Sequence, residues 1–258
     1  MKYIIATLLL SCGATRFAYA QELTVVKNEF SGLYGYTNNQ TGKTVVKPKY
    51  EAVKEFSEGL AWVQHHGKWG IIDVAGKEVA PCTLKCANQS SFAEGFSRFS
   101  ENGKYGFINN KGVVVVTPKY QQCTAFREGL ASVVVNGYTG YINTEGTEVI
   151  APQFDYSFGF SEGLAVAGLK GKAGFIDKTG KAVIAHQYDA AYLFREGLAA
   201  VTLNGKLGFI DQTGKVVIPL KFDAVNTDWQ FVFEKGKAMV YLGGKKVWID
   251  KEGNVQGV

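Results

Sequence analysis

Short apolar runs alternate with turn residues along almost the whole chain. Between Gly32 and about Gly253, runs such as Leu-Ala-x-Val, x-Gly-Phe-Ile-Asp and x-Val-Ile are rich in β-branched and aromatic residues, and Gly, Asn or Asp separates them. Runs of this length and composition, bounded by turn residues, predict short β-strands. The connections between them carry no long helical periodicity. The pattern therefore predicts an all-β chain.

The strands recur in a fixed order. A segment close to Gly-Lys-x-Gly-Phe-Ile-Asp starts at five glycines, with a worn copy at 32–36 and a half copy at 245–250. A second frame, Glu-Gly-Leu-Ala or a close variant, recurs in phase, with its glycines at positions 59, 95, 129, 163 and 197. A third frame pairs proline with an aromatic residue at 48–50, 118–120 and 152–154. Together they define about six and a half tandem repeats of roughly 34 residues over 32–253.

Each repeat is predicted to be a three-stranded antiparallel meander. Asn102-Gly103, Asn136-Gly137 and Asn204-Gly205 separate the first two runs. This dipeptide is typical of a two-residue hairpin turn with positive φ at both positions. Another glycine marks the turn between the second and third runs. Proline is expected to end the third strand because it lacks a backbone N–H.

A three-stranded meander cannot bury both of its apolar faces alone, so neighbouring repeats must pack together. The phenylalanine two residues before Glu-Gly is predicted to lie at these contacts, as Phe56, Phe92, Phe126, Phe160 and Phe194. The predicted architecture is an open, solenoid-like stack of meanders. A closed β-propeller-like ring is the alternative, although propeller blades usually have four strands and about 40 or more residues.

The first twenty residues resemble a secretory leader. Lys2 precedes an apolar run over 3–10, and Ala18-Tyr19-Ala20 is typical of a signal peptidase site. Residues 1–20 are therefore predicted to be a signal peptide, and residues 21–258 a mature domain in the periplasm or secreted.

A second processing site is the alternative. Leu9-Leu10-Ser11-Cys12-Gly13 resembles a bacterial lipobox, which would leave a lipoprotein anchored through Cys12. No later apolar run is long enough to span a membrane.

The charged residues are distributed by the repeat rather than gathered in one place. Asp73, Asp177, Asp211 and Asp250 follow the second run, where a carboxylate is expected to accept hydrogen bonds from turn amides. The Gly-Lys lysines are balanced by the Glu-Gly glutamates, and the formal net charge is only +5. Nucleic acid is disfavoured as a partner, because phosphate binding relies on clustered, uncompensated bases.

No constellation for catalysis is found. The chain lacks a phosphate-binding loop and a Gly-x-Ser-x-Gly elbow, and it has three histidines. Catalysis also needs one constellation rather than one residue per repeat. The sequence predicts no catalytic residue, no cofactor and no metal, and hence a protein that is not an enzyme.

The second repeat departs from the others by two extra residues between Cys82 and Phe92. Cys82 and Cys86 are predicted to form a disulfide in an oxidising compartment, with Cys123 left free. The alternative is a zinc site of these two cysteines with His65 and His66. The disulfide is preferred because adjacent histidines cannot easily both reach one ion.

The segment Gly67-Lys68-Trp69-Gly70 and the recurring Phe-x-Glu-Gly-Leu-Ala resemble the WG repeat, or KWG repeat, family. Only the second repeat keeps the Trp-Gly pair, since Tyr105, Ala173 and Leu207 replace the tryptophan in other copies. The resemblance implies a β-rich repeat domain of bacterial proteins with no general catalytic activity. It transfers no functional residue to this chain.

The leading functional hypothesis is a non-enzymatic scaffold that binds an envelope protein or peptide. It requires exposed apolar residues along one face over several repeats. The alternative is a glycan-binding module, in which exposed aromatic residues stack on sugar rings in one groove. The candidate binding aromatics are Trp62, Trp69, Trp229 and Trp248.

Overall fold

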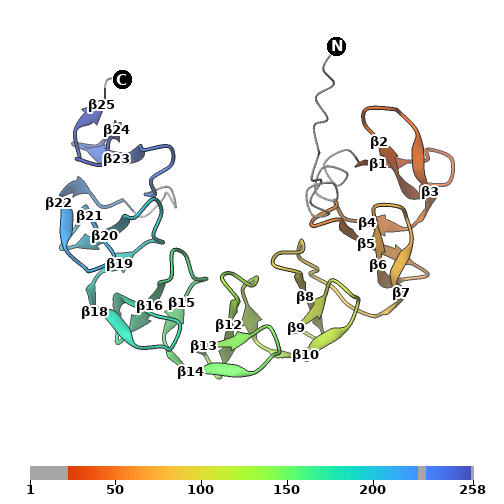
Figure 1. Ribbon diagram of the computed structural model, residues 1–258, viewed down its shortest axis with the longest axis horizontal. Coiled ribbons are helices and arrows are strands. Elements are labelled where there is room, and N and C mark those ends of the chain that lie inside the picture. Colours follow the sequence, from red (N-terminus) through yellow and green to blue (C-terminus); the bar gives the residue numbers. More distant parts are fainter. Residues whose placement is uncertain (1–22, 226–230, 257–258) are drawn as a thin grey trace, which may run out of the picture. The chain divides into compact units, whose positions relative to one another are not determined.

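The computed structural model describes residues 23–225 and 231–256, and within them every regular element is a β-strand (Figure 1). The all-β prediction is confirmed. The described residues include no helix that is long and apolar enough to cross a membrane. The signal peptide, the lipobox cysteine Cys12 and Trp229 lie outside the described residues.

The chain forms two compact units, one ending at Lys119 and the other beginning at Tyr120. The first unit holds three sheets, although the last residue of its final strand belongs to the second unit. Their strands are β1 (Leu23–Lys27), β2 (Tyr34–Asn38) and β3 (Thr44–Tyr50); β4 (Ala52–Val53), β5 (Leu60–His65), β6 (Lys68–Asp73) and β7 (Glu78–Leu84); and β8 (Phe96–Glu101), β9 (Lys104–Asn109) and β10 (Val114–Tyr120).

The second unit holds four sheets. Their strands are β11 (Gln122–Cys123), β12 (Leu130–Val135), β13 (Tyr138–Asn143) and β14 (Glu148–Phe154); β15 (Tyr156–Ser157), β16 (Ala165–Leu169), β17 (Lys172–Ile176) and β18 (Ala182–Tyr188); β19 (Ala190–Ala191), β20 (Ala199–Leu203), β21 (Lys206–Ile210) and β22 (Val216–Asp223); and β23 (Ala238–Leu242), β24 (Lys245–Ile249) and β25 (Val255–Gln256).

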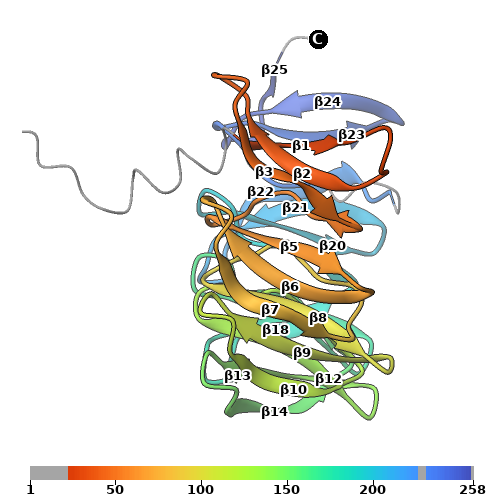
Figure 2. The same cartoon turned by 90° about the vertical axis from the view of Figure 1, so that its right-hand side faces the viewer.

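Every sheet is an antiparallel meander whose three main strands follow one another in the chain, as β5–β6–β7 do in Figure 2. Four sheets gain a short additional strand, namely β4, β11, β15 or β19. This strand forms because the connection after the aromatic residue runs beside the next repeat, as in the pairing of Ala52 with Gln64. With four strands, these sheets have as many strands as a typical propeller blade. The number of strands therefore no longer argues against a closed, propeller-like ring. The choice between open array and ring stays a prediction.

Proline does not end the third strand, and this expectation was wrong. Pro152 lies inside β14, opposite a register shift between Thr139↔Phe154 and Tyr141↔Ile150. Between these two pairs Gly140 alone faces three residues of β14, which is an enlarged β-bulge. Proline is tolerated there because a bulge on an edge strand leaves its position out of the ladder.

The bulge explains the glycine of the Trp-Gly pair. A Cβ on Gly140 would lie 2.4 Å from the carbonyl oxygen of Ile150 and 2.6 Å from the nitrogen of Pro152. Gly70, which follows Trp69, meets the same obstacle, with Ala80 O at 2.6 Å. Only glycine lets the two backbones approach this closely.

The predicted hairpin turns are confirmed. Asn136 and Gly137 have φ of 51° and 84°, as a two-residue turn with two left-handed positions requires. The Glu-Gly pair forms a second turn of this kind, with φ of 53° at Glu128 and 83° at Gly129. Each repeat from the second onward therefore has two tight turns of the same class.

The core lies between successive sheets of each unit. Phe160, only 1% exposed, packs with Tyr141 and Ile150 of the sheet before it and with Ile176 of its own. Phe194 contacts Phe175 with ring centroids 4.8 Å apart. The predicted interior role of Phe126, Phe160 and Phe194 is confirmed by their burial.

Candidate functional site

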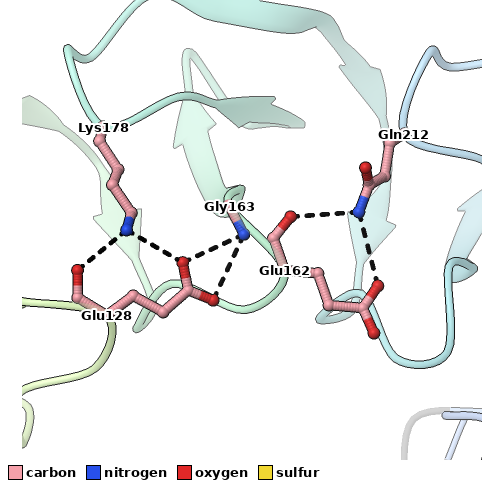
Figure 3. Close-up of polar contacts among 5 residues, drawn as sticks. All are labelled: Glu128, Glu162, Gly163, Lys178 and Gln212. Atoms are coloured by element: carbon pink, nitrogen blue, oxygen red, sulfur yellow. Dashed lines mark hydrogen bonds and ion pairs between the residues drawn. The ribbon is translucent and has the colours of Figure 1, made fainter.

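The Glu-Gly turns of successive repeats are linked by carboxylates. Glu58 accepts hydrogen bonds from the backbone N–H of Glu94, at 2.9 Å, and of Gly95, at 2.8 Å. In the second unit, Glu128 accepts from the N–H of Gly163 (Figure 3). Glu162 accepts from the N–H of Gly197 in the same way. We call Glu58, Glu128, Glu162 and Glu196 the glutamate ladder. A tight turn leaves amides unpaired, and the carboxylate of the preceding repeat satisfies them.

A side chain from further along the chain completes each step of the ladder in the second unit. Lys178 donates to the backbone oxygen of Glu128, at 3.0 Å, and forms an ion pair of 3.2 Å with its carboxylate. Gln212 donates to Glu162 in the same way (Figure 3). Hydrogen bonding from Lys251 lowers the pKa of Glu196. These acids and bases are engaged in joining repeats.

The aspartates after the second strand have the predicted turn role. Asp177 Oδ1 accepts from the N–H of Thr179 at 2.9 Å and from that of Lys181 at 3.0 Å. A further bond from the Thr179 hydroxyl is the main cause of its lowered pKa. Asn109 and Asn143 make the equivalent backbone contacts. Because an amide serves equally well, the position requires an acceptor rather than a charge.

The third strands of three sheets in the second unit share an exposed apolar position. Val149, Val183 and Val217 occupy the same position of β14, β18 and β22 and are 43%, 45% and 41% exposed. We call these three residues the valine row. Each third strand is the terminal strand of its sheet. Two residues further along the same face, Ala151, Ala185 and Pro219 are also exposed.

The first unit carries valine at the same position, but its surroundings differ. Val45 is 38% exposed, while Val79 and Val115 are half-buried. Two residues further along, Lys47 and Thr117 are polar and exposed. An exposed valine followed two residues later by another exposed apolar residue is therefore found in β14, β18 and β22 of the second unit and in none of the third strands of the first.

The three candidate binding aromatics that the structure describes differ in exposure. Trp62 is 1% exposed, and its indole N–H donates to Ser97 Oγ at 3.0 Å, so its placement on the surface was wrong. Trp69 is half-buried against the core of its repeat. Trp248 is exposed, at 51%, in the last sheet of the second unit.

The two cysteines of the second repeat lie in different surroundings. Cys82 packs with the cluster around Tyr36 and Ala61, whereas Cys86 packs with the cluster around Trp62. Both are free thiols, and burial raises the pKa of each. The disulfide stays a prediction.

His65 and His66 are grouped with a carboxylate rather than with the thiols of Cys82 and Cys86 as potential metal ligands. The side chain that lies with them is the carboxylate of Glu51, and all three potential ligand atoms lie within 4.8 Å of one another. His186 occupies the slot of proline in β18, where its ring stacks on Phe154 and burial lowers its pKa.

Comparison with known families settles what the repeats are. The model of the WG containing repeat matches six times, at residues 34–69, 69–105, 105–138, 140–172, 174–206 and 208–245. The chain belongs to the WG-repeat family. Each matched WG repeat runs from the second strand of one sheet to about the second strand of the next. No curated protein matches the chain.

This WG-repeat chain is also similar to solved structures. A crystal structure of the eukaryotic initiation factor covers 90% of this chain and 72% of its own, with a TM-score of 0.57 at 13% identity. Hsv2 of Kluyveromyces lactis covers 77% of this chain and 73% of its own, with a TM-score of 0.47 at 10% identity. The first likeness, at this identity, is one of fold alone.

The sequence held a signal for the valine row that the strand assignment did not use. In Val149-Ile150, Val183-Ile184 and Val217-Ile218 two adjacent positions are apolar. Adjacent residues of a strand point to opposite faces, so one of each pair must face away from the core. The glutamate ladder had no such signal, because its acceptor and donor lie in different repeats.

Proposed function

We propose that this WG-repeat chain is an exported, non-enzymatic scaffold that binds a protein or peptide partner. The observation that carries the proposal is the valine row, which repeats an exposed apolar side chain at one position of three successive sheets. Aligned apolar residues of this kind favour a partner that makes the same contact several times along its length.

The partner is expected to bind by side-chain contact rather than by adding a strand. All five prolines of the chain lie in third strands, and Pro152 and Pro219 lie in β14 and β22. Proline on an edge strand discourages pairing with another chain, since it has no N–H to donate. The apolar face of these strands remains available for packing.

A scaffold without catalysis is supported by what the charged residues do. The glutamate ladder and the turn aspartates such as Asp177 each hold backbone amides, and the same contact recurs from repeat to repeat. The glycan alternative has less support, because Trp62 is buried and Trp69 packs against the core.

A triple variant tests the proposal. Val149→Lys, Val183→Lys and Val217→Lys together should abolish recovery of the partner when the mature chain is cross-linked in envelope extract. The matched control places lysine at Tyr138 and Leu242, which are exposed, at 51% and 42%, in other strands of the same unit. Melting curves confirm folding of both variants. Equal recovery of every co-eluting protein by the triple variant and the wild type would contradict the proposal.

A further inference from the structure

The hairpin between β5 and β6 carries a group of side chains that the repeat does not require. His65 ends β5, and His66 occupies the first left-handed turn position, with φ of 51°. Other repeats place Asn102, Asn136 and Asn204 there. Asparagine is among the residues best suited to this conformation, so the turn itself does not call for histidine.

Glu51 is held against this turn by the backbone. Its carboxylate accepts hydrogen bonds from the N–H of His66, at 2.9 Å, and from that of Gly67, at 2.8 Å. Each carboxylate oxygen keeps a further lone pair for another partner. Hydrogen bonds that orient a carboxylate in this way are typical of the surroundings of metal ligands.

Equivalent hairpins give an internal comparison. In other repeats the residue after the third-strand aromatic also accepts a hydrogen bond from a turn amide. Gln121 accepts from the N–H of Gly137, Asp155 from that of Gly171 and Asp189 from that of Asn204. The residues that correspond to His65 and His66 there are Val135-Asn136, Leu169-Lys170 and Leu203-Asn204. In these repeats no histidine occupies the positions of His65 and His66, and the acceptor serves the turn and, at Asp189, an ion pair of 2.8 Å with Lys172.

We propose that Glu51, His65 and His66 form a surface site for a divalent transition metal ion of the zinc class. The proposal is independent of partner binding by the valine row. The expectation that adjacent histidines cannot easily both reach one ion does not hold here: with His66 in the left-handed turn position the imidazole centroids are 4.0 Å apart, and the three ligand atoms lie within 4.8 Å of one another. Tetrahedral zinc with bonds of about 2.0 Å needs ligand atoms about 3.3 Å apart. Because all three side chains are exposed, rotation about their side-chain bonds can bring the ligand atoms to this separation.

The ligand set selects for this class of ion. Two imidazoles and one carboxylate suit zinc, copper or nickel, whereas calcium and magnesium prefer oxygen alone. Three protein ligands on an exposed turn leave a coordination position open to water. Lys68, which pairs with His65 across the hairpin, adds an opposing charge and favours moderate affinity.

The sibling repeats supply variants that preserve the turn. His66→Asn copies three other hairpins, His65→Val copies Val135, and Glu51→Gln copies Gln121, which keeps its bond to a turn amide at 3.1 Å. His186→Pro is the control, since it removes the remaining histidine and restores the residue of sibling strands. A Cys82→Ser, Cys86→Ser double variant separates thiol binding from binding at the hairpin.

The experiment is calorimetric titration of Zn²⁺, with Ca²⁺ for comparison, into the mature chain without a histidine tag. We expect one Zn²⁺ per chain, affinity at least about ten-fold weaker in each of the three sibling variants, and no change in either control. Zn²⁺ should also raise the melting temperature of the wild type but not of His66→Asn. No Zn²⁺ binding by the wild type, full affinity in His66→Asn, or loss of binding in the cysteine variant would overturn the site.

Discussion

Two glycines of each repeat are constrained for different physical reasons. Gly137 has φ of 84° with open space around it, so it is needed for its backbone conformation. Gly140 has an ordinary conformation, but any side chain on it would collide with the bulge of β14. One position resists substitution through local strain and the other through contact with a neighbouring strand.

Alanine substitution should separate these two causes. Gly137→Ala is expected to lower the free energy of unfolding by about 1–2 kcal/mol, the usual cost of a left-handed residue. Gly140→Ala should cost more than that, because the backbone of β14 must move away. Urea denaturation of both variants measures the difference. Equal losses would show that the close approach at Gly140 is not limiting.

The turn aspartates predict how stability changes with pH. Hydrogen bonds from Thr179 and Thr213 lower the pKa of Asp177 and Asp211. A lowered carboxyl pKa contributes stability that is present above the unfolded pKa, near 4, and is lost as pH falls through the folded pKa. The stability curve should therefore be flat at neutral pH and decline below about pH 4.

Asparagine at both positions tests this dependence. Asp177→Asn with Asp211→Asn should leave stability at pH 7 nearly unchanged, since Asn143 makes the same backbone contacts. The decline below about pH 4 should become shallower, because two titrating groups are gone. Thermal unfolding between pH 2 and pH 7 provides the measurement. An unchanged acid limb would place the pH dependence in other carboxylates.

At the scale of the element, each sheet depends on the one that follows it. Phe160, from the connection after β15, completes the face that Tyr141 and Ile150 present. Glu128 holds the turn that begins at Glu162 through the N–H of Gly163. Apolar packing and a charged hydrogen bond thus join the same pair of repeats.

Phe160→Ala should destabilise two sheets together. Loss of a fully buried phenyl ring typically costs about 3–5 kcal/mol. The neighbouring Phe158 is only half-buried, so Phe158→Ala should cost less than half as much. Native-state hydrogen exchange should show the added opening in β11–β14 and β15–β18. A loss confined to one sheet would contradict packing between repeats.

Features set within one repeat were predictable from the sequence. The Asn-Gly hairpins, the turn aspartates and the buried phenylalanines each follow from a few adjacent residues. The bulge at Pro152 was missed because proline alone does not reveal that Gly140 lies opposite it. The hydrogen bonds of the glutamate ladder and the exposure of the valine row depend on how strands of different repeats pack. The hydrophobic periodicity of the sequence does not specify this packing.

At the scale of the whole molecule, the sequence predicts an open array. The last sheet covers apolar residues of the preceding one, with Phe209 and Phe222 in the same cluster as Val240. A chain truncated after Lys235 should therefore still fold, with a lower melting temperature, because its other repeats keep their neighbours. A closed ring would lose folding entirely on this truncation. X-ray scattering of the mature chain should report an elongated particle, whereas a compact disc would contradict the open array.

Photocrosslinking in cells can detect a protein or peptide that binds along the valine row. A photoreactive phenylalanine analogue replaces Val183 in one strain and Tyr138, exposed elsewhere in the same unit, in another. We expect a discrete crosslinked protein from position 183 and none from position 138. No crosslink at 183, or the same products at both positions, would contradict this expectation.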